Sequence, residues 1–186
     1  MKIYLLRHAE RGHGKEQDEL TSRGANQSEE IIPFLKEINP DYIICAETNR
    51  AKKTIEPFLK KYNLNAEYTP LVNEQEMGEL LGKSGSEYRK KLEESGLNKQ
   101  EFRPKGGENY FDLLKRARIF LDKIKKEKYK NILISTHAGF IRSVIKLILD
   151  IPSDELVFDP ASISVVELDK DFNIIRYELN KKIFVG

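Results

Sequence analysis

The sequence contains a single cysteine, Cys45, so it lacks both a partner thiol for an intramolecular disulfide and the cysteine set of a zinc cluster. Its first apolar run, residues 3–6, is too short for the core of a signal peptide and much too short to span a bilayer. These absences favour a reducing compartment. We therefore expect a cytoplasmic protein with no membrane partner.

An excess of charge of one sign is also absent. The chain carries 32 lysine and arginine residues against 30 aspartate and glutamate residues, for a formal net charge of +2. Without a dominant basic field, nucleic acid is not expected as a partner. Internal repeats, low-complexity tracts and a convincing interdomain linker are missing as well, so residues 1–186 are expected to form one domain. The sequence does not specify an oligomeric state.

The usual sequence signatures of nucleotide sites and two-metal sites are missing. The chain has neither a Gly-x-x-x-x-Gly-Lys-Ser/Thr loop nor a cluster of aspartates, so we predict no metal site and no cofactor. Cys45 and Arg50 resemble the pair of a cysteine-dependent phosphatase, but the interval between them is one residue short and contains no glycine. Cys45 is therefore expected to be a buried thiol.

Three short runs, residues 3–6, 42–45 and 132–135, are continuously apolar. Such runs are typical of strands buried on both faces of a largely parallel sheet. Helical spacing predicts helices over residues 25–38, 48–62, 109–128 and 140–149. The first should end at Asn39, because the residue before a proline avoids the helical region. The second has Thr48 or Asn49 as its expected N-cap.

The third of these helices is expected to present one apolar stripe, made of Phe111, Leu114, Phe120, Leu121 and Ile124. Alternation of strands and helices indicates an α/β fold, a three-layer sandwich with a mostly parallel central sheet and helices on both faces. Residues 162–168 and 173–179 read as a C-terminal antiparallel hairpin at or near one edge, with its turn at residues 169–171. The polar stretch at about 79–107 is expected to form a helical excursion over the site.

Polar residues suited to phosphate chemistry follow each of the three predicted strands. They are Arg7 and His8, then Arg50, then His137. Ligands of open parallel sheets bind beyond the carboxyl ends of the strands, where these side chains can converge. Arginine binds phosphate oxygens through a planar fork, and histidine can serve as nucleophile or general acid. The residues alone do not decide which histidine attacks.

Backbone groups are expected to complete this phosphate site. Helix starts after His8, at Thr48 and Asn49, and after His137 would each present N–H donors to an anion. Gly139 would also let the chain approach the phosphate closely.

The sequence resembles the histidine phosphatase superfamily, also called phosphoglycerate mutase-like, in an ordered series of motifs within residues 1–150. The matching segments are Leu6-Arg7-His8-Ala9-Glu10, Leu20-Thr21-Ser22-Arg23-Gly24-Ala25-Asn26-Gln27, Ala46-Glu47-Thr48-Asn49-Arg50-Ala51-Lys52-Lys53-Thr54, Leu71-Val72-Asn73-Glu74 with Gly78, Gly107-Glu108-Asn109, and Ser135-Thr136-His137-Ala138-Gly139-Phe140-Ile141-Arg142. The resemblance implies a phosphoglycerate mutase-like fold.

The resemblance also implies roles for the residues that match. His8 would be the nucleophile that becomes phosphorylated, and Glu74 the proton donor, with Glu76 as the competing carboxylate. The side chains of Arg7, Arg50 and His137, together with Ala138, would bind the phosphoryl group. Water would then hydrolyse the phosphohistidine, which makes the chain a phosphatase acting on a small phosphorylated metabolite.

The loop after the nucleophile departs from the family pattern. Arg11 and Gly14 stand where many members have a small hydroxyl residue and an asparagine. Arg11 and His13 are therefore candidates for substrate binding instead. Glu108 is a third candidate, with two alternatives: it caps the following helix, or it binds an arginine.

The function expected from these residues is metal-independent hydrolysis of a phosphomonoester through a phosphohistidine. One alternative is a cofactor-dependent phosphoglycerate mutase, which would use the same residues but return the phosphoryl group to its substrate. Typical mutases of the family are longer than this chain, which favours hydrolysis. The other alternative is a phosphate-binding regulatory module without turnover, which the full set of Arg7, His8, Arg50, Glu74 and His137 disfavours.

Overall fold

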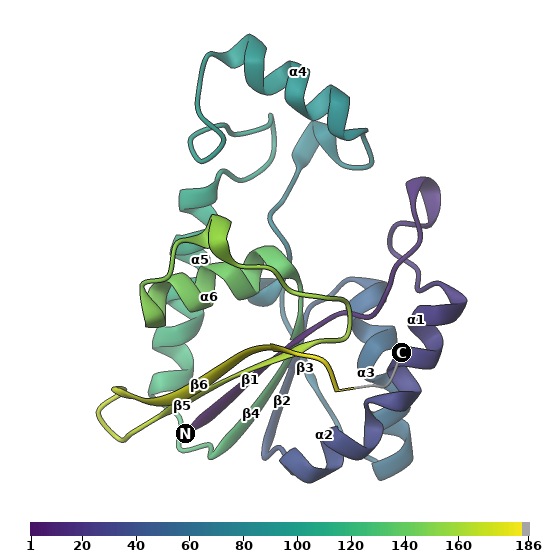
Figure 1. Ribbon diagram of the computed structural model, residues 1–186, viewed down its shortest axis with the longest axis vertical. Coiled ribbons are helices and arrows are strands. Elements are labelled where there is room, and N and C mark those ends of the chain that lie inside the picture. Colours follow the sequence, from purple (N-terminus) through teal and green to yellow (C-terminus); the bar gives the residue numbers. More distant parts are fainter. Residues whose placement is uncertain (184–186) are drawn as a thin grey trace.

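The computed structural model describes residues 1–183, and its strands form a six-stranded sheet (Figure 1). The strands are β1 (Lys2–Arg7), β2 (Tyr42–Cys45), β3 (Glu67–Tyr68), β4 (Asn131–Thr136), β5 (Ile163–Leu168) and β6 (Ile174–Lys181). Their order across the sheet is β3-β2-β4-β1-β5-β6. The first four strands in that order run parallel, whereas β5 pairs antiparallel with β1 and β6. The expected mostly parallel sheet with a C-terminal hairpin at one edge is confirmed.

The helices cover both faces of this sheet. They are α1 (Ser22–Glu30), α2 (Ile32–Ile38), α3 (Asn49–Tyr62), α4 (Gly85–Ser95), α5 (Tyr110–Lys125) and α6 (Ala138–Leu149). Figure 1 shows α5 and α6 on one side of the sheet, with α1, α2 and α3 on the other. The expected three-layer α/β sandwich is confirmed. No helix within residues 1–183 is long and apolar enough to cross a membrane.

The two central strands are buried on both faces, as their continuous apolar sequences predict. Ile3, Leu5 and Leu6 of β1 have no exposed surface, and neither do residues 132–134 of β4. Two-sided burial requires side chains of both orientations to be apolar, so alternation is absent from these strands. Cys45 at the end of β2 is also fully buried, and burial raises the pKa of its thiol to about 12. The expectation of a buried thiol is confirmed.

The helix predicted over residues 25–38 is wrong in its start and in its continuity. The structure begins α1 at Ser22, because the hydroxyl of Thr21 accepts a hydrogen bond from the amide of Gly24 at 3.0 Å and caps the helix. The chain then breaks between α1 and α2 at Ile31, two residues before Pro33. Proline has no N–H and its ring clashes with the preceding turn, so it starts a new helix instead of continuing the old one. The predicted end at Asn39 is confirmed.

The apolar stripe predicted for α5 is wrong at two positions, Phe111 and Leu114. Phe111 is 51% exposed and Leu114 is only half-buried, whereas Phe120 is 1% exposed. Leu113 and Ala117 are buried in their place, so the core-facing stripe is rotated away from Phe111. The helix begins where expected because Asn109 caps it reciprocally with Asp112.

Residues 79–107 carry α4 and stand beyond the carboxyl end of the sheet, at the top of Figure 1. No residue of α4 is buried, and Tyr88 packs edge-on against Phe102 at 5.6 Å between ring centroids. Two backbone hydrogen bonds close the base of the excursion: Glu79 N to Lys105 O at 3.0 Å, and Glu108 N to Glu76 O at 2.8 Å. The excursion also contacts α5: the amide of Tyr110 donates to the carbonyl of Gln100 at 3.1 Å, and Arg103 pairs with Asp112 at 2.7 Å. That residues 1–186 form one domain stays a prediction.

The two phenylalanines of α5 provide a direct test of this packing. We expect Phe120→Ala to lower the free energy of unfolding by about 3–5 kcal/mol, because it leaves a cavity in the core. Phe111→Ala should cost less than about 1 kcal/mol, because half of the ring is already in water. Urea unfolding followed by circular dichroism measures both values. Equal costs for the two substitutions would contradict the orientation of α5.

Candidate active site

The register between β1 and β4 brings two histidines together at the carboxyl edge of the sheet. Arg7, the last residue of β1, pairs with Thr136, the last residue of β4. The amide of His8 extends this ladder by donating to the carbonyl of Thr136 at 2.8 Å. The next residues, His8 and His137, therefore lie side by side, with ring centroids 5.1 Å apart.

His8 is only 4% exposed, and a backbone carbonyl next to its ring determines which ring nitrogen carries the proton. Its Nδ1 lies 2.8 Å from the carbonyl oxygen of Ala9. A carbonyl can only accept, so Nδ1 carries the proton and Nε2 keeps its lone pair. Burial lowers the pKa of His8 to about 3, the charges of Arg50 and Arg7 act in the same direction, and the Ala9 carbonyl opposes them. His8 is consequently a neutral imidazole with a nucleophilic nitrogen at physiological pH.

His137 is fully buried and is held by the start of α3. Its Nε2 lies 3.2 Å from the hydroxyl oxygen of Thr48, the N-cap residue of α3. The Thr48 hydroxyl contacts the histidine and makes no capping hydrogen bond to α3. Burial lowers the pKa of His137 well below its ordinary value, and the charge of Arg50 lowers it further. Its Nδ1 is a buried atom without a hydrogen-bond partner among the described residues.

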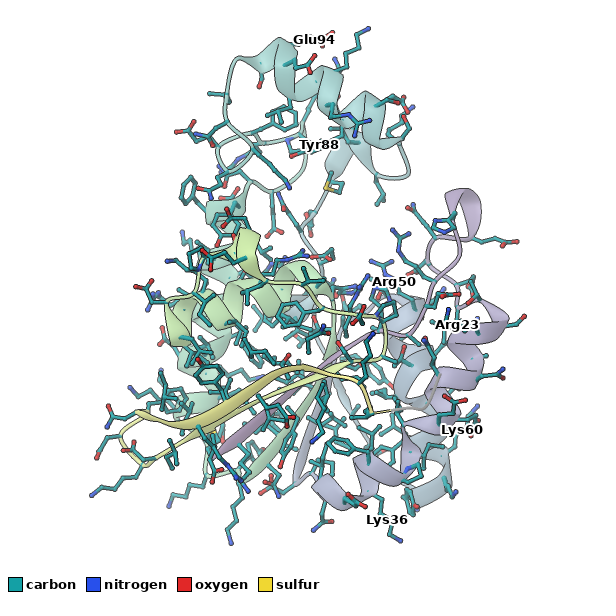
Figure 2. All side chains as sticks on the ribbon, viewed as in Figure 1. Arg23, Lys36, Arg50, Lys60, Tyr88 and Glu94 are labelled. Carbon is teal, nitrogen blue, oxygen red and sulfur yellow. The ribbon has the colours of Figure 1, made fainter. Side chains whose placement is uncertain are left out.

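Two arginines flank the histidines, and each is tied to the protein through one terminal nitrogen. Arg7 Nη1 donates to the carbonyl of Phe158 at 2.5 Å, and Arg50 Nη1 donates to Oδ1 of Asp18 at 2.8 Å. Burial lowers the pKa of both guanidinium groups, and the nearby carboxylates Glu74 and Asp18 oppose that shift at Arg7 and Arg50 respectively. Figure 2 shows Arg50 at the carboxyl edge of the sheet, below the excursion that carries Tyr88.

Three buried nitrogens of this group share one property. Within residues 1–183, Arg7 Nε, Arg50 Nε and His137 Nδ1 have no hydrogen-bond partner. Buried polar groups are costly when they are unsatisfied, and most proteins pair nearly all of them. Their concentration around His8 is the arrangement expected of a site that binds an anion with several acceptor oxygens, such as phosphate.

Glu74 reaches the same site from the loop that follows Val72. Its Oε2 accepts from the amide of Gly139 at 3.3 Å, and its Oε1 accepts from the amide of Gln75 at 3.1 Å. A Cβ at position 139 would lie 2.1 Å from Oε1, so any other residue there would displace this carboxylate. The expected close approach of Gly139 to a phosphate stays a prediction. Ala138, the first residue of α6, contributes one of the free N–H groups of a helix start.

The loop that carries Glu74 is held by Arg116, a residue that the sequence did not single out. Arg116 of α5 donates to two carbonyls of the preceding 3-10 turn, Pro70–Val72, and to two of this loop, including that of Glu74 at 3.0 Å. It also binds both carboxylate oxygens of Glu108, at 2.9 and 2.7 Å. Of the alternatives considered for Glu108, the structure shows the one in which its carboxylate binds an arginine. A charged residue next to the buried stripe of α5 was the available signal, because a buried arginine needs partners.

The motif residues around the His8 loop hold its backbone. The hydroxyl of Thr54 accepts from the amide of Ala9 at 2.9 Å, and the side chain of Gln27 accepts from the amide of Glu10 at 2.9 Å. A Cβ at Gly24 would lie 2.0 Å from the carbonyl oxygen of Glu10, which explains why glycine stands there. These contacts fix the chain directly after the proposed nucleophile.

The helix expected to start directly after His8 is absent, and this expectation is wrong. The chain forms a loop up to Thr21, closed by an antiparallel bridge between Arg11 and Leu20, with a short 3-10 turn at Gly14–Glu16. A loop rich in glycine and charge has no apolar face to bury, so nothing stabilises a helix at that place. The expected start of α3 at Thr48 and Asn49 and that of α6 after His137 are confirmed.

The candidate substrate residues of this loop and its neighbours lie in different surroundings. Arg11 and Glu76 line a cavity of about 650 Å³, together with Asp18, Arg50 and Glu74. His13 is exposed and does not line this cavity. Residues 77, 78 and 80–83, where the excursion begins, also line this cavity. No cluster of three or more His, Cys, Asp or Glu side chains that could hold a metal occurs in the described part of the chain.

Comparison with known proteins agrees with this fold. The model of the histidine phosphatase superfamily (branch 1) matches residues 3–179. Adenosylcobalamin/α-ribazole phosphatase of Escherichia coli (strain K12) is 24% identical and is covered over 94% of its length by 95% of this chain.

Solved structures give the same result for the fold. The α-ribazole phosphatase of Shigella flexneri has a TM-score of 0.82 at 24% identity, with 100% of this chain and 98% of that chain covered. Mycobacterial glucosyl-3-phosphoglycerate phosphatase, in complex with inorganic phosphate, has a TM-score of 0.80 at 19% identity, with coverages of 100% and 99%. These similarities confirm the phosphoglycerate mutase-like fold.

Titration of the histidines tests the electrostatics of the site. Because burial depresses the pKa of His8 to about 3, its imidazole ¹⁵N shifts should show a neutral ring protonated at Nδ1 from pH 8 down to pH 5. The unfolded chain binds a proton there near the ordinary pKa of about 6.5. The free energy of unfolding should therefore fall as pH drops from about 6.5 toward 3. A titration midpoint of His8 between pH 6 and 7 would contradict the assignment.

Proposed function

The chain belongs to the histidine phosphatase superfamily, and on that premise we propose that it is a metal-independent phosphatase that works through a phosphohistidine on His8. The observation that carries this proposal is the buried His8, whose Nδ1 lies 2.8 Å from the carbonyl oxygen of Ala9, next to three buried nitrogens that have no partner among residues 1–183. The named phosphatases among its relatives support hydrolysis of a small phosphorylated molecule.

In the first step, the lone pair of His8 Nε2 attacks phosphorus, and the bond between phosphorus and the ester oxygen breaks. The departing oxygen takes the electron pair of that bond and a proton from Glu74. Arg7, Arg50 and His137, with the amide of Ala138, bind the non-bridging oxygens, where charge redistributes in the transition state. Since arginine stays protonated at any working pH, these two side chains supply positive charge without a metal ion.

In the second step, water attacks the phosphorus of the phosphohistidine. The carboxylate of Glu74 takes a proton from this water, and the bond between phosphorus and Nε2 breaks, which returns its electron pair to His8. The products are an alcohol and inorganic phosphate, and Glu74 is again protonated. Glu74 fits this role better than Glu76, because its carboxylate contacts Gly139 beside His137, whereas Glu76 is exposed.

The two alternatives differ in what they release. A phosphoglycerate mutase would transfer the phosphoryl group from His8 back to a substrate oxygen, with no net phosphate release. A regulatory module would bind phosphate without breaking a bond. Neither is favoured by a specific feature of the cavity, and the curated relatives are called phosphatases.

The direct test is phosphate release from para-nitrophenyl phosphate in the presence of EDTA. We expect turnover by the wild type, and roughly a thousandfold or greater loss for His8→Ala, since the nucleophile is removed. Thermal unfolding of the variant serves as the folding control. Turnover that EDTA abolishes, or that survives unchanged in His8→Ala, would contradict the proposal.

The same assay can be extended to a panel of phosphorylated metabolites. The names of the relatives make α-ribazole 5′-phosphate and glucosyl-3-phosphoglycerate the first compounds to include. Isomerisation of phosphoglycerate without phosphate release would favour the mutase, and phosphate binding without turnover of any compound would favour the regulatory module.

A further inference from the structure

Asp18 holds one of the two phosphate-site arginines in a way that the matched motifs do not explain. Its Oδ1 accepts from Arg50 Nη1 at 2.8 Å, and its Oδ2 accepts from the amide of Asn49, the first residue of α3, at 3.1 Å. One carboxylate therefore links the guanidinium to the start of a 14-residue helix. Both partners favour a negative charge, since the helix start carries partial positive charge.

The edge of Arg50 that Asp18 leaves free is the edge that binds oxyanions. In a guanidinium group, the N–H bonds of Nε and Nη2 lie parallel on one edge and form a fork, whereas Nη1 lies on the other side of the group, next to Cδ. Arg50 is 15% exposed at its side chain, and its Nε is buried without a partner among residues 1–183. Arg7 has the same arrangement: its Nη1 donates to the carbonyl of Phe158, and its Nε has no partner in the described part of the chain.

We propose that Asp18 is a positioning residue that fixes the Arg50 guanidinium so that its Nε and Nη2 edge faces the phosphoryl group. This inference rests on the proposed function of the site. Asp18 does not touch the reacting atoms; it acts by removing the rotational freedom of Arg50 before substrate arrives. A bidentate clamp is effective only when its geometry is held in advance, because a displacement of about 1 Å can cost two orders of magnitude in rate.

The loop that presents Asp18 is itself anchored. The amide of Gly12 donates to the carbonyl of Glu19 at 2.9 Å, beside the bridge between Arg11 and Leu20. The side chain of Glu19 binds Lys53 on α3, one turn away from Arg50. The carboxylates of Asp18 and Glu19 therefore both bind residues of α3, but only Asp18 contacts Arg50.

A different role for Asp18 predicts the opposite change in phosphate affinity. If Asp18 were simply an internal anion that occupies Arg50 until substrate displaces it, removing its charge would strengthen phosphate binding, because a nearby negative charge repels an anion. If Asp18 positions Arg50, removing it weakens binding despite the loss of that repulsion. The direction of the change separates the two roles.

Isothermal titration calorimetry with inorganic phosphate provides the test, using the full chain. We expect Asp18→Ala to raise the dissociation constant roughly tenfold. Asp18→Asn keeps an acceptor oxygen and should stay within about threefold of the wild type. The matched control is Glu19→Gln, which removes the same charge from the same loop without touching Arg50, and it should leave binding unchanged. In an Arg50→Ala background, Asp18→Ala should cause no further loss of affinity, because the loss passes through Arg50.

Each other result is decisive. Tighter or equal phosphate binding by Asp18→Ala overturns the positioning role, as does a loss that persists in the Arg50→Ala background. A lowered melting temperature with unchanged phosphate affinity shows a purely structural loop contact and also overturns it. A wild type that neither binds phosphate nor hydrolyses any phosphomonoester overturns the proposed function, and this inference with it, whereas the preceding results concern Asp18 alone.

Discussion

The parallel register of β1 and β4 is the constraint on which the rest of this structure depends. It pairs Arg7 with Thr136, so the residues that follow both strands emerge at the same level. A slip of one residue would turn His8 to the opposite face of the sheet and separate it from His137. The register is set along the strands that lead to the site, by fully buried apolar side chains that must all face the correct layer. The packing of the core therefore determines the geometry of the chemistry.

Burial has two consequences at this edge that reinforce one another. It lowers the pKa of His8 and of His137, which favours the neutral imidazole with its nucleophilic nitrogen, and it leaves a nitrogen of Arg7 and one of Arg50 without a partner among the described residues. Both features cost stability in the absence of ligand, since buried polar groups are favourable only when they are paired. A bound phosphoryl group would supply the missing acceptors. The site is thus an example of local instability that is tolerated because it serves binding.

The main layers and the central pair of histidines could be predicted from sequence because they depend on short-range patterns. Apolar runs identify buried strands, and the residues that follow parallel strands lie at the same edge of the sheet. The contacts of Asp18 and Arg116 could not be predicted in this way. Asp18 lies 32 residues from Arg50, and Arg116 lies 42 residues from Glu74, with nothing in local spacing to connect them. The error at Phe111 has a simpler cause, since an apolar residue at the edge of a helical stripe can face either the core or the solvent.

The central claim is that His8 Nε2 forms a covalent bond to phosphorus during turnover. Rapid acid-free quenching of the enzyme with a ³²P-labelled substrate, followed by peptide mass spectrometry and ³¹P NMR at alkaline pH, locates that bond directly. The account predicts a phosphoryl group on His8, attached at Nε2, that forms and decays at least as fast as overall turnover. A phosphoryl group on His137, or steady turnover with no phosphoenzyme at any time point, would contradict it.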